Sequence, residues 1–387
     1  MTGAVPKIDI DLFGDDSLRN PFADYQRLRD AGPLVKLGRP DAYAMGRFDD
    51  VQAALRAADC LISGQGVGFS DTFNAPKGMN VLQSDGDLHR RLRAAVTKPL
   101  TPARLSKARE DLKKMVTERI RALSGQGWFD AMPSLASFLP VEAVSHLVGL
   151  PDAGRDRMLE WAAASFNLIG PRQADADVVS MREAFVFIST LSPDTVRDGS
   201  WAAELFAAAE NGRLAMQEAM AAISAYVIPS LDTTIMAKGH LLNNLAAHPD
   251  QWAMLKQQPD LIPSAVLEGV RHSSVLRWFS RVATADYQVG DAVLPQGARV
   301  MLLYGCANRD ERHYEKPDRF DISRDARDHL AWGTGPHMCA GMNLARVEME
   351  VLLEALVEQD ADLTVGEAVM GTNAGLYGFA SLPFRLD

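Results

Sequence analysis

The chain has 387 residues, of which 40 are Lys or Arg and 50 are Asp or Glu, so its formal net charge is −10. This acidic balance argues against a general nucleic-acid binder, which needs a surplus of basic residues. Because 47% of the residues are hydrophobic and 23% are charged, the chain can bury a large core and is not mainly disordered.

Cysteine spacing and apolar runs narrow the class of protein further. Cys60, Cys306 and Cys339 lie far apart, so neither a disulfide framework nor a thiolate zinc site is expected. We find no apolar run of the roughly 18 to 20 residues that span a bilayer. The acidic residues near the start do not resemble a signal peptide. These features predict a cytoplasmic protein without a membrane contact.

Helical periodicity dominates the chain, because apolar residues recur at three- and four-residue spacing. The expected helices are 102–123, 141–149, 214–247, 263–273 and 342–359. Strand-like stretches are short and fall in two places, 34–46 and 281–303. No long Gly-, Ser- or Pro-rich linker divides the chain. We therefore expect a mainly α fold with a small β region, as a single domain over residues 1–387.

Positive charge is concentrated between His89 and Arg121, where eleven Lys and Arg stand against three Asp and Glu. One interpretation is a solvated helix face. The other is a docking surface for an acidic partner protein, because a basic patch on an acidic body steers association. The sequence leaves both open.

The most informative segment is residues 329–356, HLAWGTGPHMCAGMNLARVEMEVLLEAL. Gly333 allows a tight backbone path, and Cys339 follows where an amphipathic helix begins. The N–H groups at a helix N-terminus stabilise a thiolate and make it a competent metal ligand. Gly341 is small enough for a flat macrocycle to approach the backbone. A phosphate-binding loop and an inert buried cysteine are the alternatives, but the Gly-Lys-Ser/Thr ending of a phosphate loop is missing.

Residues 332–341, WGTGPHMCAG, resemble the haem-ligand signature of the cytochrome P450 family, aromatic-Gly-x-Gly-x-His-x-Cys-x-Gly. The resemblance covers nearly the whole chain and implies a single-domain cytochrome P450 fold of the bacterial, soluble, ferredoxin-dependent type. It implies haem b as the cofactor and Cys339 as the thiolate ligand of its iron, with Gly333 and Gly341 beside it. Trp332 stands where the family usually has Phe.

One ion pair and one set of four cationic side chains support this resemblance. Glu268 and Arg271 are spaced i and i+3 on an expected helix and resemble the Glu-x-x-Arg ion pair of the family, which anchors the ligand loop. Arg319 or Arg324 would be the third member. The family also holds the two haem propionates with cationic side chains, and the positions that match here are His89, Arg93, Arg281 and His337.

Asp232 and Thr233 match the acid-alcohol pair on the long central helix of the family, which delivers protons to dioxygen. The alternative for Thr233 is a hydroxyl that bonds back to a helix carbonyl. Pro229 and Ser230 stand just before this pair, where small residues are usual. Because proline lacks an N–H and clashes with the carbonyl of Ala225, we expect the helix to kink here.

Several segments, among them 64–71 and 166–172, look most like bacterial members that O-demethylate para-substituted aromatic ethers. In those enzymes an arginine and serines hold a substrate carboxylate, whereas the matching positions here are Gln65, Ala225 and Ile228. This difference favours a neutral or phenolic aromatic substrate, although Arg277 lies near the expected pocket and could pair with an anion. The pocket candidates are Phe69, Phe166, Ile169, Ile228, Leu276, Arg277 and Phe379.

The resemblance thus implies a monooxygenase that inserts one oxygen atom of dioxygen into a small organic substrate. No flavin or nicotinamide domain is fused to the chain, so ferredoxin and ferredoxin reductase are the expected electron donors, meeting the basic segment near Arg90 to Lys114. Three alternatives remain. They are a haem-thiolate protein without external electrons (peroxygenase, dehydratase or sensor), a monooxygenase of a terpenoid-like substrate, and a haem-free helical binding protein.

Overall fold

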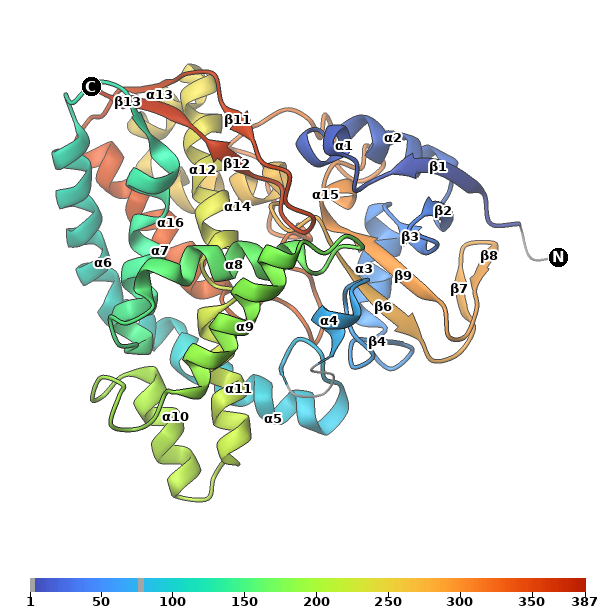
Figure 1. The fold of residues 1–387 in the computed structure, drawn as a ribbon. Coiled ribbons are helices and arrows are strands. Elements are labelled where there is room, and N and C mark those ends of the chain that lie inside the picture. Colours follow the sequence, from blue (N-terminus) through green and yellow to red (C-terminus); the bar gives the residue numbers. More distant parts are fainter. Residues whose placement is uncertain (1–3, 76–79) are drawn as a thin grey trace.

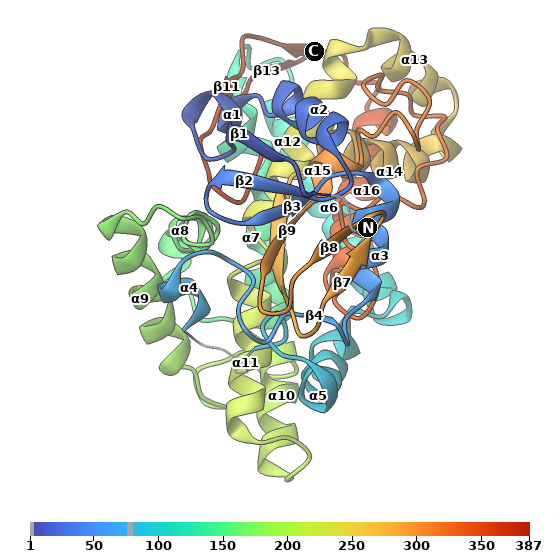
Figure 2. The same ribbon diagram turned by 90° about the vertical axis from the view of Figure 1, so that its right-hand side faces the viewer.

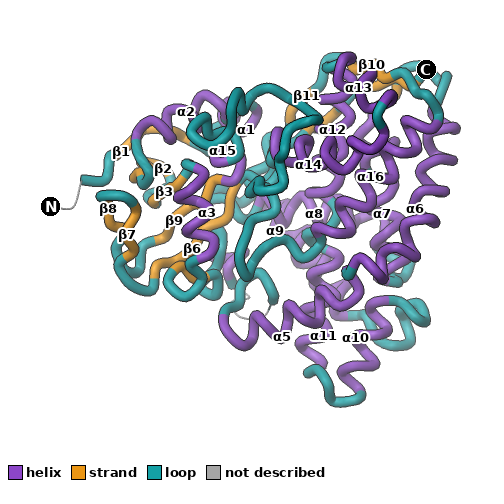
Figure 3. The backbone as a smooth tube through the Cα atoms, turned by 180° about the vertical axis from the view of Figure 1, so that it is seen from behind, coloured by secondary structure: helices purple, strands orange, loops and turns teal. Residues whose placement is uncertain are grey.

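The structure, a computed structural model, describes residues 4–75 and 80–387. Long helices form its body, and the strands of the main sheet lie on the other side of the molecule together with β7 (Tyr287–Val289) and β8 (Ala292–Leu294), whereas β10 (Leu363–Val365) and β11 (Val369–Met370) lie against the helices (Figure 3). The helices that surround the candidate site are α5 (Gly86–Thr97), α6 (Pro102–Leu123), α11 (Met216–Val227), α12 (Asp232–Ala247), α14 (Ile262–Ser273) and α16 (Met342–Glu358) (Figure 1). This arrangement confirms the expected mainly α fold with a small β region.

The remaining helices cover this body and its edges. They are α1 (Asp15–Arg19), α2 (Phe22–Ala31), α3 (Phe48–Arg56), α4 (Asp71–Asn74), α7 (Phe138–Ala143), α8 (Met158–Asn167), α9 (Asp175–Ser189), α10 (Trp201–Glu210), α13 (Pro249–Gln257) and α15 (Tyr304–Ala307). The helix α16 packs along α6, and α12 packs against α14. One large hydrophobic cluster runs through these four helices, because each presents an apolar stripe to its neighbours.

The main sheet joins strands from the N-terminal part of the chain to two strands between residues 278 and 303. Its strand order is β1 (Lys7–Asp11), β2 (Val35–Arg39), β3 (Tyr43–Met45), β9 (Arg299–Leu303), β6 (Trp278–Ala283) and β4 (Leu61–Ile62). Figure 2 shows β1, β2 and β3 beside β9, which comes from far along the sequence. The pairs β1–β2 and β3–β9 are parallel, and the other pairs are antiparallel.

Three smaller sheets complete the β region. They are β10 (Leu363–Val365) with β13 (Pro383–Leu386) and β5 (Phe129–Asp130), β11 (Val369–Met370) with β12 (Phe379–Ser381), and β7 (Tyr287–Val289) with β8 (Ala292–Leu294).

Most predicted helices lie within a residue or two of their observed limits, but two differ. The stretch predicted at 141–149 begins earlier, because α7 leads directly into a π-helical turn at Val144–Val148. The stretch predicted as one helix at 214–247 is two helices, α11 and α12, separated by residues 228–231. Pro229 lies in this gap and lacks the N–H that a continuous helix needs. The expected kink is therefore a complete break.

The same stretch corrects the expectation that no apolar run is long enough to cross a membrane. Within the described residues, Met216–Ala247 passes that test by length and composition, with a mean hydropathy of 1.3 over its most apolar window. Half of that window is buried inside the protein. Core helices of this kind pass the same test, and α12 lies in the middle of the helical body (Figure 1).

Several basic residues of α5 and α6 form ion pairs with acidic residues of neighbouring helices. The ion pairs are Arg91–Glu218, Arg104–Glu204, Arg109–Glu350 and Lys113–Glu358. These contacts fasten α5 and α6 to α10, α11 and α16. The basic segment therefore serves partly to hold helices together, while Lys98, Lys107 and Lys114 stay exposed.

Candidate active site

A cavity between α5, α12 and α16 brings together most of the predicted site residues. Those that line it are His89, Arg93, Phe166, Thr233, Leu276, Arg281, Gly333, His337, Cys339 and Gly341. They come from segments that are up to 252 residues apart in the sequence. A second hollow, beside Arg19, Phe22 and Tyr377, opens widely to solvent and contains none of the predicted residues.

The loop before α16 presents Cys339 to this cavity. Gly333 and Gly335 have φ values of +66° and +74°, in the left-handed region that favours glycine. A Cβ on Gly335 would lie 2.7 Å from the carbonyl oxygen of Leu55, so no larger residue fits there without movement. The main-chain N–H of Cys339 donates to the carbonyl of Trp332 at 2.8 Å. This bond closes the loop and leaves the Cys339 side chain open to the cavity.

The sulfur of Cys339 lies at the N-terminal end of α16, as the sequence predicts. Burial raises the pKa of the Cys339 thiol, while the N–H groups of Gly341 and Met342 and the charge of Arg93 act against this rise. The expected stabilisation of a thiolate is present, but burial outweighs it in the protein alone. At Gly341 a Cβ would lie 4.0 Å from the sulfur, which is an ordinary van der Waals contact.

Four cationic or potentially cationic side chains lie on the cavity wall near this loop. The rings of His89 and His337 have their centroids 4.1 Å apart. His337 has its Nε2 3.7 Å from a carboxylate oxygen of Asp85. Arg281 donates to the carbonyl of Ser280 at 2.8 Å. Burial lowers the pKa of Arg93.

His89 shows that this cluster is incomplete. Its Nε2 is buried and has no hydrogen-bond partner among the described residues. Burial, followed by the charges of His337 and Arg93, lowers the pKa of His89 to about 4. A buried polar group without a partner is costly, so such a cluster needs an anionic ligand. Two carboxylates on a macrocycle whose metal takes a thiolate match this set of donors, and the residues present therefore fit haem b.

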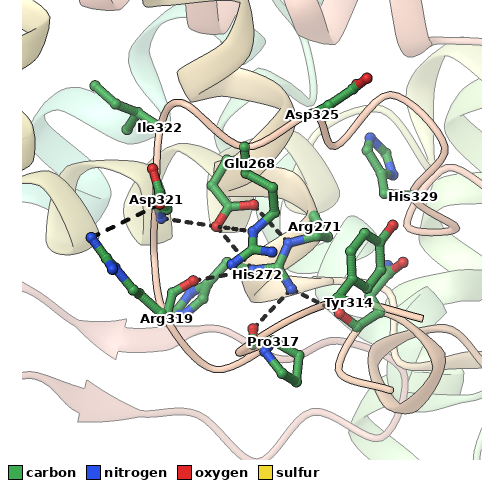
Figure 4. Close-up of polar contacts among 12 residues, drawn as sticks. Glu268, Arg271, His272, Tyr314, Pro317, Arg319, Asp321, Ile322, Asp325 and His329 are labelled. Atoms are coloured by element: carbon green, nitrogen blue, oxygen red, sulfur yellow. Dashed lines mark hydrogen bonds and ion pairs between the residues drawn. The ribbon is translucent and has the colours of Figure 1, made fainter. Parts of the chain in front are cut away.

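The Glu268–Arg271 pair is fully buried and has many partners (Figure 4). The guanidinium of Arg271 donates to both carboxylate oxygens of Glu268, at 2.6 and 2.9 Å. It also donates to the carbonyls of Asn308 and Pro317, at 2.8 and 2.9 Å. A bidentate pair that also binds main-chain carbonyls fixes the loop after α15 against α14.

The structure identifies the third member of this cluster. The Nε of Arg324 lies 3.4 Å from Glu268 and is largely buried. The side chain of Arg319 is mostly exposed and lies 3.9 Å from Asp321 instead. Of the two candidates that the sequence left open, Arg324 is therefore the one that contacts Glu268.

The break between α11 and α12 shapes the opposite wall of the cavity. Thr233 lines the cavity, and its Oγ1 donates to the carbonyl of Pro229 at 3.0 Å, so the hydroxyl does bond back to a helix carbonyl. Asp232 is the first residue of α12, is 5% exposed and is outside the cavity lining. Burial alone raises the pKa of Asp232 to about 7. This carboxyl can therefore both release and accept a proton near neutral pH.

Five of the predicted pocket residues do not line the cavity: Phe69, Ile169, Ile228, Arg277 and Phe379. The sequence left open the possibility that Arg277 pairs with a substrate anion, but its guanidinium donates to the carbonyls of Leu12, Ser17 and Leu18 and is directed away from the cavity lining. Phe69 packs against Trp278, and Phe379 packs against His240. These aromatic side chains belong to the hydrophobic core.

Some cavity residues are missed by the sequence analysis. Ser230, Thr234, Ala237, Phe279 and Tyr304 all line the cavity. Glu348 also lines it, and one of its carboxylate oxygens lies 2.9 Å from the Nζ of the fully buried Lys238. A lysine inside the apolar stretch of α12 indicates a buried ion pair, but its partner is 110 residues away and cannot be identified from spacing.

Comparisons with known proteins agree with this geometry. The cytochrome P450 family matches residues 189–359. The chain is 32% identical to "Cytochrome p450 CYP199A2" of Rhodopseudomonas palustris, over 99% of this chain and 95% of that one. It is 33% identical to "Beta-dihydromenaquinone-9 omega-hydroxylase" of Mycobacterium tuberculosis, over 97% of this chain and 78% of that one.

Solved structures show the same fold. Epothilone D-bound cytochrome P450epoK has a TM-score of 0.88 and 25% identity, covering 98% of this chain and 99% of that one. Cytochrome P450 CYP109Q5 from Chondromyces apiculatus has a TM-score of 0.83 and 27% identity, with 98% of both chains covered. These similarities extend over the whole sheet and helical body that hold the cavity. The chain therefore belongs to the cytochrome P450 family, whose members are monooxygenases that bind haem b.

Proposed function

We propose that this monooxygenase oxidises a small, neutral or phenolic aromatic substrate, and that its reaction is the O-demethylation of an aryl methyl ether. The observation that carries the proposal is that one cavity has two kinds of lining. One part of the lining is the open cysteine with four cationic or potentially cationic side chains, among them His89, whose Nε2 has no partner among the described residues, and the other part is apolar.

The first part of the cavity is the proposed cofactor site. Cys339 is the proposed iron ligand, and Gly333 and Gly341 give the macrocycle room. The four propionate-binding side chains are then His89, Arg93, Arg281 and His337. When bound, haem supplies the activation of dioxygen with two electrons.

Asp232 and Thr233 are the proposed proton-handling residues. With a pKa of about 7, Asp232 holds a proton that it can release near neutral pH. Thr233 lies on the cavity wall one residue further on, and its oxygen accepts hydrogen bonds from that side because its own hydrogen is directed to Pro229. We assign proton supply to Asp232 and the positioning of a hydrogen-bonded proton to Thr233.

Apolar side chains on the second part of the cavity indicate the substrate class. Phe166, Val275, Leu276 and Phe279 line it, and Ala225 lies where related enzymes have a polar residue. Arg277 is occupied by three carbonyls and is not available to a carboxylate. A benzoate would therefore lose its hydration without gaining a cation.

The stoichiometry of the proposed O-demethylation requires two electrons from an external donor. Dioxygen, two electrons and two protons convert the methyl group to a hydroxymethyl ether and give one water, and the hemiacetal then separates into a phenol and formaldehyde. Ferredoxin and ferredoxin reductase are the proposed donors, in the cytoplasm. The proposed docking face is the segment near Arg90 to Lys114. Because Arg109 and Lys113 of this segment are paired with acidic residues of α16, exposed side chains such as Lys98 and Lys107 are the proposed contacts.

The proposal is tested with purified protein and its Cys339→Ser variant. The reduced carbon-monoxide difference spectrum of the parent should show the thiolate-type band, and formaldehyde should appear with 4-methoxyphenol when a reduced ferredoxin and its reductase supply the electrons. The variant should lose both. If the colour and the turnover of the variant equal those of the parent, Cys339 is not the ligand.

Substrate charge is tested by titration of the parent protein. We expect 4-methoxyphenol to bind more tightly than 4-methoxybenzoate, and tighter binding of the acid would contradict the preference for neutral substrates.

A second candidate is hydroxylation of a terpenoid-like apolar substrate. It is favoured by the apolar wall and by the similarity to an enzyme named as a menaquinone hydroxylase. Turnover of a terpene panel without any formaldehyde from aryl ethers would establish this alternative instead.

A further inference from the structure

Two hydroxyl groups face the cavity at the break between α11 and α12. Ser230 and Thr233 both line the cavity, and they lie three residues apart. Each donates its single hydrogen to a carbonyl four residues earlier, Ser230 to Tyr226 and Thr233 to Pro229. A hydroxyl group has one hydrogen to donate and two lone pairs that accept. Toward the cavity, both oxygens therefore act as hydrogen-bond acceptors.

The helix break explains why these bonds form and why a ligand does not displace them. Carbonyl groups at the end of a helix lack main-chain donors from the next turn. Hydroxyl groups of Ser and Thr commonly supply the missing hydrogen, and an unpaired buried carbonyl would be costly. Ser230 is half-buried at this break, so a ligand that took its hydrogen would leave the Tyr226 carbonyl without that bond.

The charged side chains of the cavity also disfavour an anionic ligand beside Ser230 and Thr233. The cationic side chains on the cavity wall are those that we assign to the haem propionates, and Arg277 is turned to main-chain carbonyls. A carboxylate beside Ser230 would meet acceptor oxygens and no free cation. A neutral hydroxyl group would instead donate its hydrogen to a lone pair of Ser230.

We propose that Ser230 is a specificity-determining residue, which accepts a hydrogen bond from a hydroxyl group of the substrate, while Thr233 keeps its role in proton positioning. The subsite selects phenols or alcohols over carboxylates and over molecules without a donor. Sites built to bond a substrate hydroxyl discriminate strongly against analogues that lack it. This inference rests on the proposed function, because its subsite is part of the proposed substrate cavity.

The test compares two ligands of nearly equal shape, 4-methoxyphenol and 4-methylanisole, in which a methyl group replaces the hydroxyl. The haem-loaded protein is titrated with each, following the Soret band and, independently, the heat of binding. We expect Ser230→Ala and Ser230→Gly to weaken 4-methoxyphenol by about five- to tenfold, the size of one hydrogen bond, and to change 4-methylanisole less than about twofold. Unchanged carbon-monoxide spectra and melting temperatures would show that both variants fold.

Thr234→Val is the matched control, because Thr234 lines the same cavity on the neighbouring turn. Its ligand preference should stay within about twofold of the parent. Equal weakening of both ligands in the Ser230 variants, no weakening of either, or selective loss in Thr234→Val would overturn the assignment to Ser230. If neither ligand binds the parent protein, the proposed substrate class fails and this assignment fails with it. Binding without any dependence on Ser230 contradicts the assignment alone.

Discussion

Two groups of buried charged residues differ in whether the protein itself supplies their partners. In the Glu268–Arg271 cluster, both carboxylate oxygens and the guanidinium are bonded to protein groups. In the cluster on the cavity wall, the Nε2 of His89 has no partner among the described residues. A satisfied buried network stabilises a fold, whereas an unsatisfied one indicates a ligand. Buried charged residues whose partners the protein supplies are therefore structural, and buried ones that lack a partner indicate a ligand.

The largest effect that this comparison predicts is in the satisfied cluster. Arg271→Met leaves the carboxylate of Glu268 buried with fewer partners, and breaking a buried pair in this way costs about 3 to 5 kcal/mol of the free energy of unfolding. Urea unfolding measures it. Arg327→Met is the control, because the ion pair between Arg327 and Asp325 is exposed and should contribute little to the free energy of unfolding. Equal losses in the two variants would show that the cluster does not carry the fold.

Asp232 is a third case, a buried acid without a charged partner in the described part of the chain. Its pKa of about 7 lies above the ordinary value of 3.8. Between these values the folded state holds a proton that the unfolded state has released, so stability falls as the pH rises through this range. We expect the parent to lose about 3 kcal/mol between pH 5 and pH 8 through this group. Asp232→Asn should lack that loss. Parallel pH profiles of the two proteins, from urea unfolding, would contradict it.

The loop that carries the cysteine depends on backbone space. Gly335→Ala should cost about 2 kcal/mol, because its φ is +74° and the new Cβ would lie 2.7 Å from a carbonyl oxygen. Gly297 has a φ of +78° with open space around it, so Gly297→Ala isolates the cost of the backbone conformation, about 1 kcal/mol. Thermal unfolding of both variants measures the difference, and equal losses would show that the contact with Leu55 is unimportant.

The sequence pattern predicted those features that depend on neighbouring residues in the chain, such as helix limits and glycine conformations. The helix 102–123 was predicted to the residue, because a long amphipathic stripe and Pro102 define it. The loop from Trp332 to Gly341 has its glycines and Cys339 in the expected arrangement, because the left-handed conformations at Gly333 and Gly335 depend on residue type.

Contacts between distant segments could not be predicted in this way. Leu276 lines the cavity while the adjacent Arg277 reaches the carbonyls of residues 12–18, some 260 residues earlier. The pairing of Lys238 with Glu348 and the choice of Arg324 over Arg319 also depend on how segments pack. The break after Val227 is predicted from Pro229 only as a kink, and the hydroxyl bonds that Ser230 and Thr233 make at the break are not visible in the spacing.

The smallest effect on the free energy of unfolding is expected for the cluster on the cavity wall that contains His89. A change there should alter how tightly haem is retained and not how stably the protein folds. His89→Leu removes a buried nitrogen that has no protein partner, so the free energy of unfolding of the protein should not fall by more than about 0.5 kcal/mol. Loss of one charge-assisted hydrogen bond to a propionate should speed haem transfer to apomyoglobin about tenfold. His146→Leu changes an exposed histidine and should leave the transfer rate unchanged. An unaltered rate in His89→Leu, together with a large loss of folding stability, would place His89 among the structural charges and remove the distinction between the two clusters.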